Sequence, residues 1–152
     1  MSYTDVQARQ EMLDVLAEAV DDLARALASL GAAYEQLDEQ RADALEEQLF
    51  RPVQRAYGRA KRTHAEFAAR HGLPGREFDT PSPGAPSTGV KRFVENAIEQ
   101  LDRAESELVS LQDSLMPVEV GDTELRAGLT EVRQLIDGLP HRADAFVRAF
   151  GR

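Results

Sequence analysis

The sequence has no cysteine and only three histidines among its 152 residues. Without cysteine there is no disulfide, no thiolate metal site and no thiol nucleophile. A di-metal site in a helical bundle uses inward glutamates and two Glu-x-x-His pairs, and none of the histidines follows that spacing. We therefore expect no metal and no cofactor. A two-histidine site formed by His64 and His71, seven residues apart, is the lesser alternative.

Several other features are missing as well. No stretch approaches the roughly 18 uncharged apolar residues that a membrane-spanning helix needs. The first residues lack the basic region and apolar run of a secretory signal. Motifs of serine hydrolases and of phosphate-binding loops do not occur. We expect a protein that is not an enzyme and does not contact membranes, and the absence of cysteine fits a cytoplasmic location.

The charge is strongly negative and unevenly distributed. The net charge is −9, and residues 1–50 hold twelve acids and three bases. Residues 51–77 reverse this balance with seven bases and two acids. An acidic protein is repelled by nucleic acid overall, so we do not expect nucleic acid as a partner.

The strongest pattern that is present lies between residues 13 and 37. Apolar residues recur there at alternating spacings of three and four, which predicts one long packed helix. The seam consists of Leu13, Leu16, Val20, Leu23, Leu27, Leu30, Tyr34 and Leu37. Small residues flank this seam, and they favour close contact with more than one neighbouring helix. Thr4 with Gln7 is a plausible capping box at the start of the helix.

The sequence allows two interpretations of the end of this first helix. Helical periodicity continues to about Phe50, and Pro52 follows. Either the chain turns near Phe50 and Arg51 and a second helix begins at Pro52, or one very long helix is kinked there. Charge complementarity favours the turn, because the basic second helix would then fold back on the acidic first one.

Three further segments complete the predicted fold. Gly72, Leu73 and Pro74 form a typical helix stop, and residues 72–89 are rich in proline and glycine, which predicts a linker between the second and third helices. The third helix is capped by Ser87 or Thr88 and stops before Pro117, and residues 117–121 form a short connection. Asp122 caps the fourth helix, in which Gly138 predicts a kink or a brief break.

These elements predict an all-α protein. The sequence favours a single domain, residues 1–152, folded as an antiparallel four-helix bundle with one very long N-terminal helix and coiled-coil-like seams.

Two groups of side chains are candidates for a binding site. Four arginines, Arg51, Arg55, Arg59 and Arg62, fall on one helical face and could bind an anion or a partner. The simpler interpretation pairs them with acids of the first helix. A pocket between helices could be lined by Tyr34, Tyr57, His64 and Phe67.

The leading functional hypothesis is a scaffold or adaptor that acts through protein–protein contacts. We expect a homodimer, because a first helix longer than its partners would leave apolar length for a second copy, and another protein is a further expected partner. A small-molecule or anion-binding bundle is the alternative. An enzyme ranks third, because no site motif is present.

Overall fold

The computed structural model describes the backbone of residues 3–150 and the side chains of residues 5–150. This part of the chain is entirely helical apart from its connections and contains no strand. The elements are α1 (Tyr3–Glu35), α2 (Glu39–Leu45), the π-helical segment η1 (Glu46–Phe50), α3 (Arg51–Arg70), the 3₁₀ turn η2 (Pro86–Thr88), α4 (Val90–Asp113), α5 (Met116–Glu119), α6 (Thr123–Ile136) and α7 (Leu139–Phe150). The side chain of Thr4, half of the predicted capping box, lies outside the described residues.

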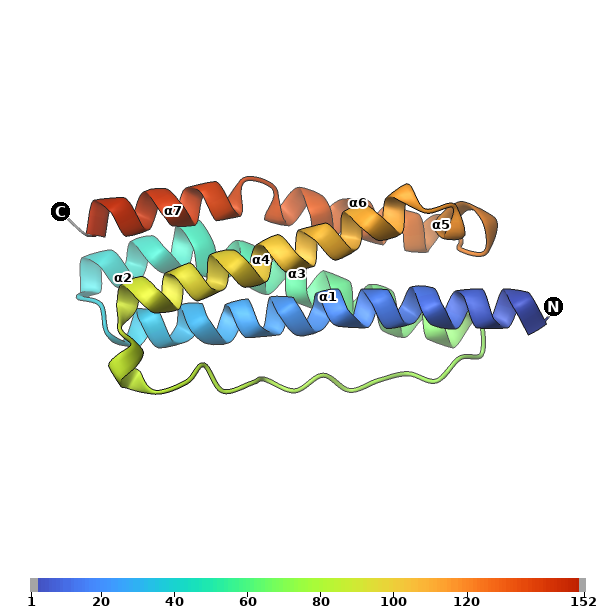
Figure 1. The fold of residues 1–152 in the computed structure, drawn as a ribbon, viewed down its shortest axis with the longest axis horizontal. Coiled ribbons are helices and arrows are strands. Elements are labelled where there is room, and N and C mark those ends of the chain that lie inside the picture. The colour runs from blue at the N-terminus through green and yellow to red at the C-terminus, as the bar shows by residue number, and fades with distance from the viewer. Residues whose placement is uncertain (1–2, 151–152) are drawn as a thin grey trace.

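The helices lie side by side along one long axis (Figure 1). Helix α1 runs the length of the molecule, and α2, η1 and α3 return beside it. An extended connection then carries the chain back to the other end, where α4 begins. Helix α4 packs against α1, while α6 packs against α3 and α7 against α4. The long N-terminal helix that the sequence predicts is therefore present.

Helix α1 ends earlier than the sequence predicts. It stops at Glu35 instead of continuing toward Phe50, and the chain reverses through Gln36, Leu37 and Asp38. Asp38 has an extended backbone, and its carboxylate accepts a hydrogen bond from the Arg41 N–H at 2.9 Å. This is an N-cap, which begins a new helix and separates it from the preceding one.

The turn predicted near Phe50 and Arg51 is wrong, because α2, η1 and α3 follow one another without a break. The Arg51 N–H bonds to the oxygen of Glu46, five residues back instead of four. This wider π-helical turn stands directly before Pro52, which has no N–H and whose ring would crowd an ordinary helical turn. The local widening lets the helix pass through the proline.

Both glycine-based interruptions are confirmed. After α3, Gly72 has a positive φ of 64° and the Leu73 N–H bonds to the Ala68 oxygen at 2.9 Å, as in a Schellman motif. Gly138, with φ 75°, separates α6 from α7.

The ends of α4 differ from the prediction. Gly89, not Ser87 or Thr88, stands at its N-cap, and no side chain caps it. At the other end, the connection that the sequence predicts over residues 117–121 begins with a short helix, α5 (Met116–Glu119). The predicted cap of the next helix is confirmed, since the Asp122 carboxylate accepts a hydrogen bond from the Leu125 N–H at 2.8 Å.

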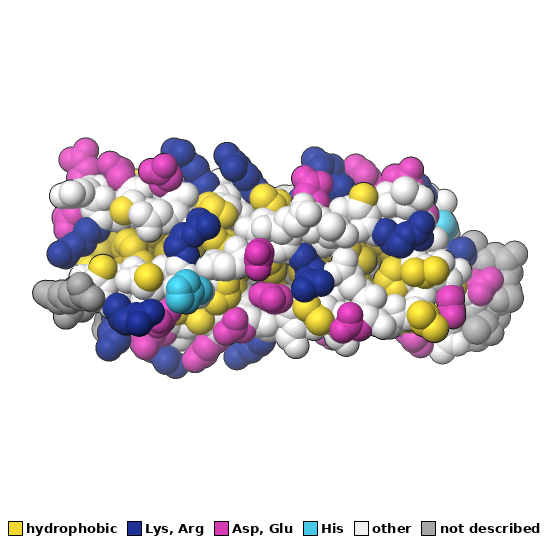
Figure 2. Space-filling view, turned by 90° about the horizontal axis from the view of Figure 1, so that it is seen from above, with side chains coloured by type: hydrophobic (Ala, Val, Ile, Leu, Met, Phe, Trp, Pro, Cys, Tyr) yellow, Lys and Arg dark blue, Asp and Glu magenta, His cyan; other side chains and the backbone are white. Residues whose placement is uncertain are grey.

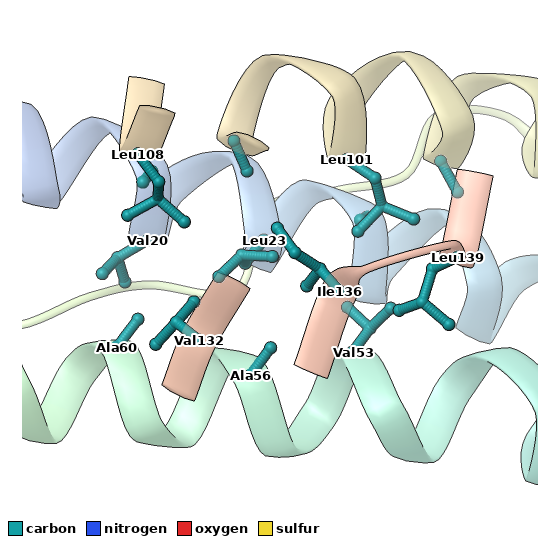
Figure 3. Packing of buried hydrophobic residues seen from close by; sticks show 14 of the residues in the cluster. Val20, Leu23, Val53, Ala56, Ala60, Leu101, Leu108, Val132, Ile136 and Leu139 are labelled. Carbon is teal, nitrogen blue, oxygen red and sulfur yellow. The ribbon is translucent and has the colours of Figure 1, made fainter. Parts of the chain in front are cut away.

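The apolar seams meet in one continuous core (Figure 3). Val20 and Leu23 of α1 face Leu101 and Leu108 of α4 across this core, and side chains of α3, α6 and α7 close it. From Leu13 to Leu30 the α1 seam is buried within the single chain, apart from the half-buried Leu27. Burial of this much apolar surface is the main force holding the helices together.

Candidate functional site

The four predicted arginines do not converge on one point. Arg59 pairs with Glu131 of α6 at 2.6 Å, Arg51 with Glu46 at 3.7 Å, and Arg62 with Glu66 at 3.8 Å. Glu46 belongs to the predicted first helix, which extends to about Phe50, whereas the partners of Arg59 and Arg62 lie on α6 and on α3 itself. Arg55 is exposed and forms no ion pair with the described residues. An anion binding here would compete with carboxylates already in place.

The four predicted pocket residues occupy different environments. Tyr34 is exposed near the end of α1, whereas His64 and Phe67 are buried on α3. Tyr57 is half-buried beneath the ammonium group of Lys61. Phe67 instead packs against His71, with ring centroids 4.4 Å apart. Nothing in these contacts brings the four side chains around a common cavity.

Histidines and acids also do not form a metal site within residues 5–150, where no group of three is arranged to hold an ion. One carboxyl pair is nevertheless unusual. Asp22 of α1 is buried, and Oε2 of Glu107 on α4 is buried without a hydrogen-bond partner. Burial, together with the neighbouring Asp22 and Glu18 carboxylates, raises the pKa of Glu107 to about 8. A protonated Glu107 can donate a hydrogen bond to the Asp22 carboxylate, so the protonation of this pair affects the stability of the fold.

The feature that distinguishes the surface is a set of exposed apolar side chains at one end of the molecule. Leu115 is 67% exposed and Val118 is 70% exposed, and they flank the buried Pro117 in and beside α5. Val6, 38% exposed, lies one turn before Arg9 on α1, and Arg9 bonds to the α5 region. We call Val6, Leu115 and Val118 the α5 surface. Figure 2 shows hydrophobic side chains at this end, next to acidic ones.

The main chain beneath the α5 surface is held firmly in place. The Arg9 Nε donates to the Val120 oxygen at 2.8 Å, and the Arg126 Nη1 donates to the Pro117 oxygen at 3.0 Å. Gly121 passes so close to Pro117 that a Cβ atom at position 121 would overlap the Pro117 carbonyl. The connection is therefore a tight turn, and the exposure of Leu115 and Val118 does not result from a loose loop.

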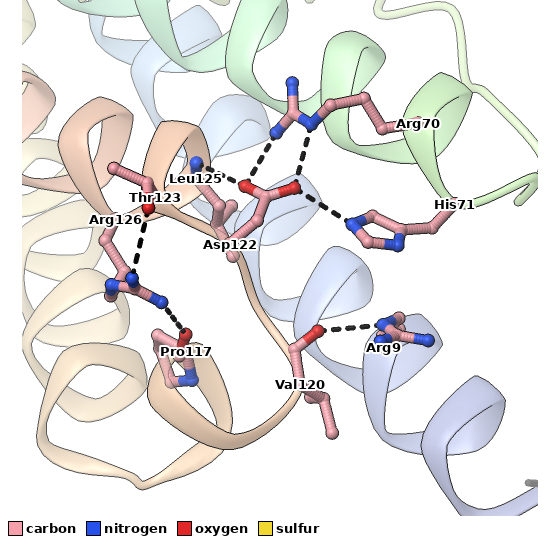
Figure 4. A network of polar contacts seen from close by, with 9 residues as sticks. All are labelled: Arg9, Arg70, His71, Pro117, Val120, Asp122, Thr123, Leu125 and Arg126. Carbon is pink, nitrogen blue, oxygen red and sulfur yellow. Dashed lines mark hydrogen bonds and ion pairs between the residues drawn. The ribbon is translucent and has the colours of Figure 1, made fainter. Parts of the chain in front are cut away.

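Asp122 fastens this turn to α3 (Figure 4). Arg70 donates to both carboxylate oxygens of Asp122, at 2.8 and 2.9 Å, and Nε2 of His71 lies 2.9 Å from one of them. Burial would raise the pKa of Asp122, but hydrogen bonds from Arg70, the Leu125 N–H and His71 outweigh it and hold that pKa well below its ordinary value. One charged side chain thus joins the end of α3 to the start of α6.

Sequence reasoning missed the α5 surface for an identifiable reason. Leu115 continues the α4 seam at the correct spacing, so the pattern assigns it to the core. The helix ends at Asp113, however, and the two residues that follow take a different direction. The one available signal was Pro117, which predicts that the seam stops before it.

No family model matches the chain, and no match was found among curated proteins or among solved structures. None of the helices within residues 3–150 combines the length and the apolar character needed to cross a membrane.

Proposed function

We propose that the chain is a non-enzymatic scaffold or adaptor that acts through protein–protein contacts at the α5 surface. The observation that supports this most directly is the exposure of Leu115 and Val118 on a turn that hydrogen bonds hold in place. Large apolar side chains gathered at a surface mark contact sites more often than isolated ones do. An ordered main chain lowers the entropy that binding must overcome.

The helices that carry this surface pack side by side along one axis (Figure 1). We propose an antiparallel four-helix bundle, in which α2, η1 and α3 count as one rod and α6 with α7 as another. Helix α1 contacts both α3 and α4, while α6 contacts α3 and α7 contacts α4. These four contacts support the arrangement. A bundle of this kind would act as a rigid body that carries the α5 surface at one end.

For the partner we favour a different protein over a second copy of the chain. The exposed acids Asp113 and Glu119 lie beside the α5 surface, so two copies meeting there would bring like charges together. A partner with an apolar centre and basic residues around it fits better. The expectation of a homodimer depends on a first helix longer than its partners, and the continuous rod formed by α2, η1 and α3 (Glu39–Arg70) nearly equals the 33 residues of α1 in length.

Site-specific photo-crosslinking tests the proposal. A photoreactive amino acid replaces Val118 in cells that express the chain. In a matched control variant it replaces Lys91, which is exposed at the end of α4 away from α5. We expect a discrete product from position 118 that disappears when Leu115→Asp is added, and none from position 91.

A product with twice the mass of the chain would identify a homodimer and contradict the favoured partner. Equal labelling from both positions, or no product from position 118, would contradict the α5 surface as the contact site.

A further inference from the structure

A second feature is the extended connection between α3 and η2, which starts at the end of the molecule where α5 lies and runs toward the other end. We call residues 73–85 the 73–85 loop. Its two ends are tied down, by the Leu73 N–H on the Ala68 oxygen and, just beyond the loop, by the side chain of Gln36 on the Pro86 oxygen at 2.8 Å. In Figure 1 the loop runs alongside α1 for most of its length.

Two side chains hold the middle of the loop. Arg76 donates to both carboxylate oxygens of Asp21 on α1, at 2.9 and 3.1 Å. Phe78 packs edge-on against His64 of α3, with ring centroids 5.4 Å apart and planes at 90°. The guanidinium of Arg76 lies over the Phe78 ring at 4.7 Å, so the two anchors also contact each other.

His64 is an unusual residue to find under such a loop. Only 4% of its surface is exposed, and its Nδ1 is buried without a hydrogen-bond partner. Burying a neutral imidazole in this position costs little free energy. Burying an imidazolium costs much more, because its charge and its Nδ1–H would both lack a partner. Burial, followed by the charge of Arg76, lowers the pKa of His64.

We propose that His64 and Phe78 form an acid-sensitive closure, in which protonation of His64 releases the middle of the 73–85 loop from α1 and α3. The imidazolium needs water, and lifting Phe78 is the easiest way to admit it. Helix α3 is fixed in the core on its other side, whereas the polar and ring contacts that tie the centre of the loop to the helices come, in the described structure, from Arg76 and Phe78.

The charges that face His64 come from two directions. Arg76 of the loop opposes a second positive charge, while Asp14 of α1 favours it. Asp21 of α1 is already bonded to Arg76. On the side of α6, the neighbouring Thr63 packs against Gly128, which has no charge. When His64 is protonated, its positive charge is therefore repelled by that of Arg76, and because Arg76 belongs to the loop, this repulsion acts on the loop.

A tryptophan reporter tests the closure, because the chain contains no tryptophan of its own. In Phe78→Trp, we expect the emission maximum to move to longer wavelength and acrylamide quenching to increase between pH 8 and pH 5. The half-point should lie below the ordinary histidine pKa of about 6.5. Far-UV circular dichroism should stay constant over the same range.

Three second-site variants separate His64 from other causes. His64→Gln should abolish the transition, and His141→Gln, at an exposed histidine on α7, should leave it unchanged. Asp14→Asn should move the half-point to lower pH, because it removes the charge that favours the imidazolium. A purely structural His64 would show no such shift.

Persistence of the transition in His64→Gln, or loss of helical signal together with it, would overturn the proposal. If the Trp variant fails to fold, hydrogen exchange of the unmodified chain gives the same decision. After correction for intrinsic rates, residues 74–85 should exchange faster at pH 5 than at pH 8, and this difference should vanish in His64→Gln.

Discussion

Arg142 of α7 donates a hydrogen bond of 2.8 Å to the main-chain oxygen of Gln48. In an ordinary α-helix that oxygen would accept from residue 52, but residue 52 is proline and has no N–H. A side chain 94 positions away therefore supplies the donor that the helix lacks. The π-helical turn and this bond together explain how one rod contains Pro52.

This relationship predicts a coupling between Arg142 and Pro52. Arg142→Met should lower the free energy of unfolding by about 1 kcal/mol, the typical value of one hydrogen bond. In a Pro52→Ala background the cost should be smaller, because the new N–H can reach Gln48. Chemical denaturation of the four proteins in this double-mutant cycle measures the coupling.

Arg148→Met serves as the control, since Arg148, within the described residues, forms an exposed ion pair with Asp144 one turn away on its own helix. Equal losses for Arg142→Met with and without Pro52 would show that the bond to Gln48 does not compensate for the proline.

Glu107 predicts a stability that falls with rising pH. Its pKa in the folded chain, about 8, is above the ordinary value of 4.5, so the folded state keeps a proton that the unfolded state loses between these values. Glu107→Gln should therefore stabilise the protein near pH 8.5 by about 1 kcal/mol, a figure reduced because the side chain is only partly buried.

At pH 4 the gain from Glu107→Gln should vanish. Thermal denaturation at both pH values, with the exposed Glu99→Gln as control, measures it. A pH-independent effect of the substitution would contradict the raised pKa.

Asp122→Asn separates the charge of Asp122 from its role as an N-cap. Asparagine still accepts from the Leu125 N–H but loses the ionic bonds to Arg70, so we expect a loss of about 1 kcal/mol at pH 7. The pKa of Asp122 is lower in the folded chain than its ordinary value of about 3.8. Its charge therefore stabilises the fold above pH 3.8, and this stabilisation is lost as the pH falls below that value. The two proteins should thus converge in urea denaturation as the pH drops below about 4.

Gly121→Ala tests the close packing beneath the α5 surface. The added Cβ would overlap the Pro117 carbonyl, so the turn must open at a cost of about 1–3 kcal/mol. Gly75→Ala is the matched control, since nothing lies within 4 Å of its Cβ position. Thermal denaturation should show a large loss for the first variant and almost none for the second, and similar melting temperatures for both would argue against the tight turn.

Much of the helical structure follows from the sequence because apolar spacing and glycine-based stops are local signals. The seam from Leu13 to Leu30 and the stop at Gly72 are of this kind. The turn at Asp38 was hidden because the heptad spacing from Leu30 to Tyr34 and Leu37 continues in phase into it. The passage through Pro52 could not be predicted, since its compensating donor is Arg142 on a helix far away in the sequence.

The candidate site was harder to predict than the helices. Its exposure depends on where α4 ends and on how Arg9, Arg126 and Asp122 hold the following turn, and all three bonds join segments that local patterns treat separately. The row of arginines on α3 shows the opposite error, a binding surface that the sequence predicts but long-range contacts neutralise. A regular row on a helix face predicts a binding surface, but Glu131 of α6 neutralises Arg59 through a contact between residues 72 positions apart.

The most direct test of the central claim is the affinity of the protein identified by crosslinking for the purified chain. Isothermal titration calorimetry would compare the unmodified chain with Val118→Asp and with Lys91→Asp. The α5 surface predicts at least a tenfold weaker Kd for Val118→Asp, about 1.4 kcal/mol, and no loss of that size for Lys91→Asp. An unchanged Kd for Val118→Asp would contradict it.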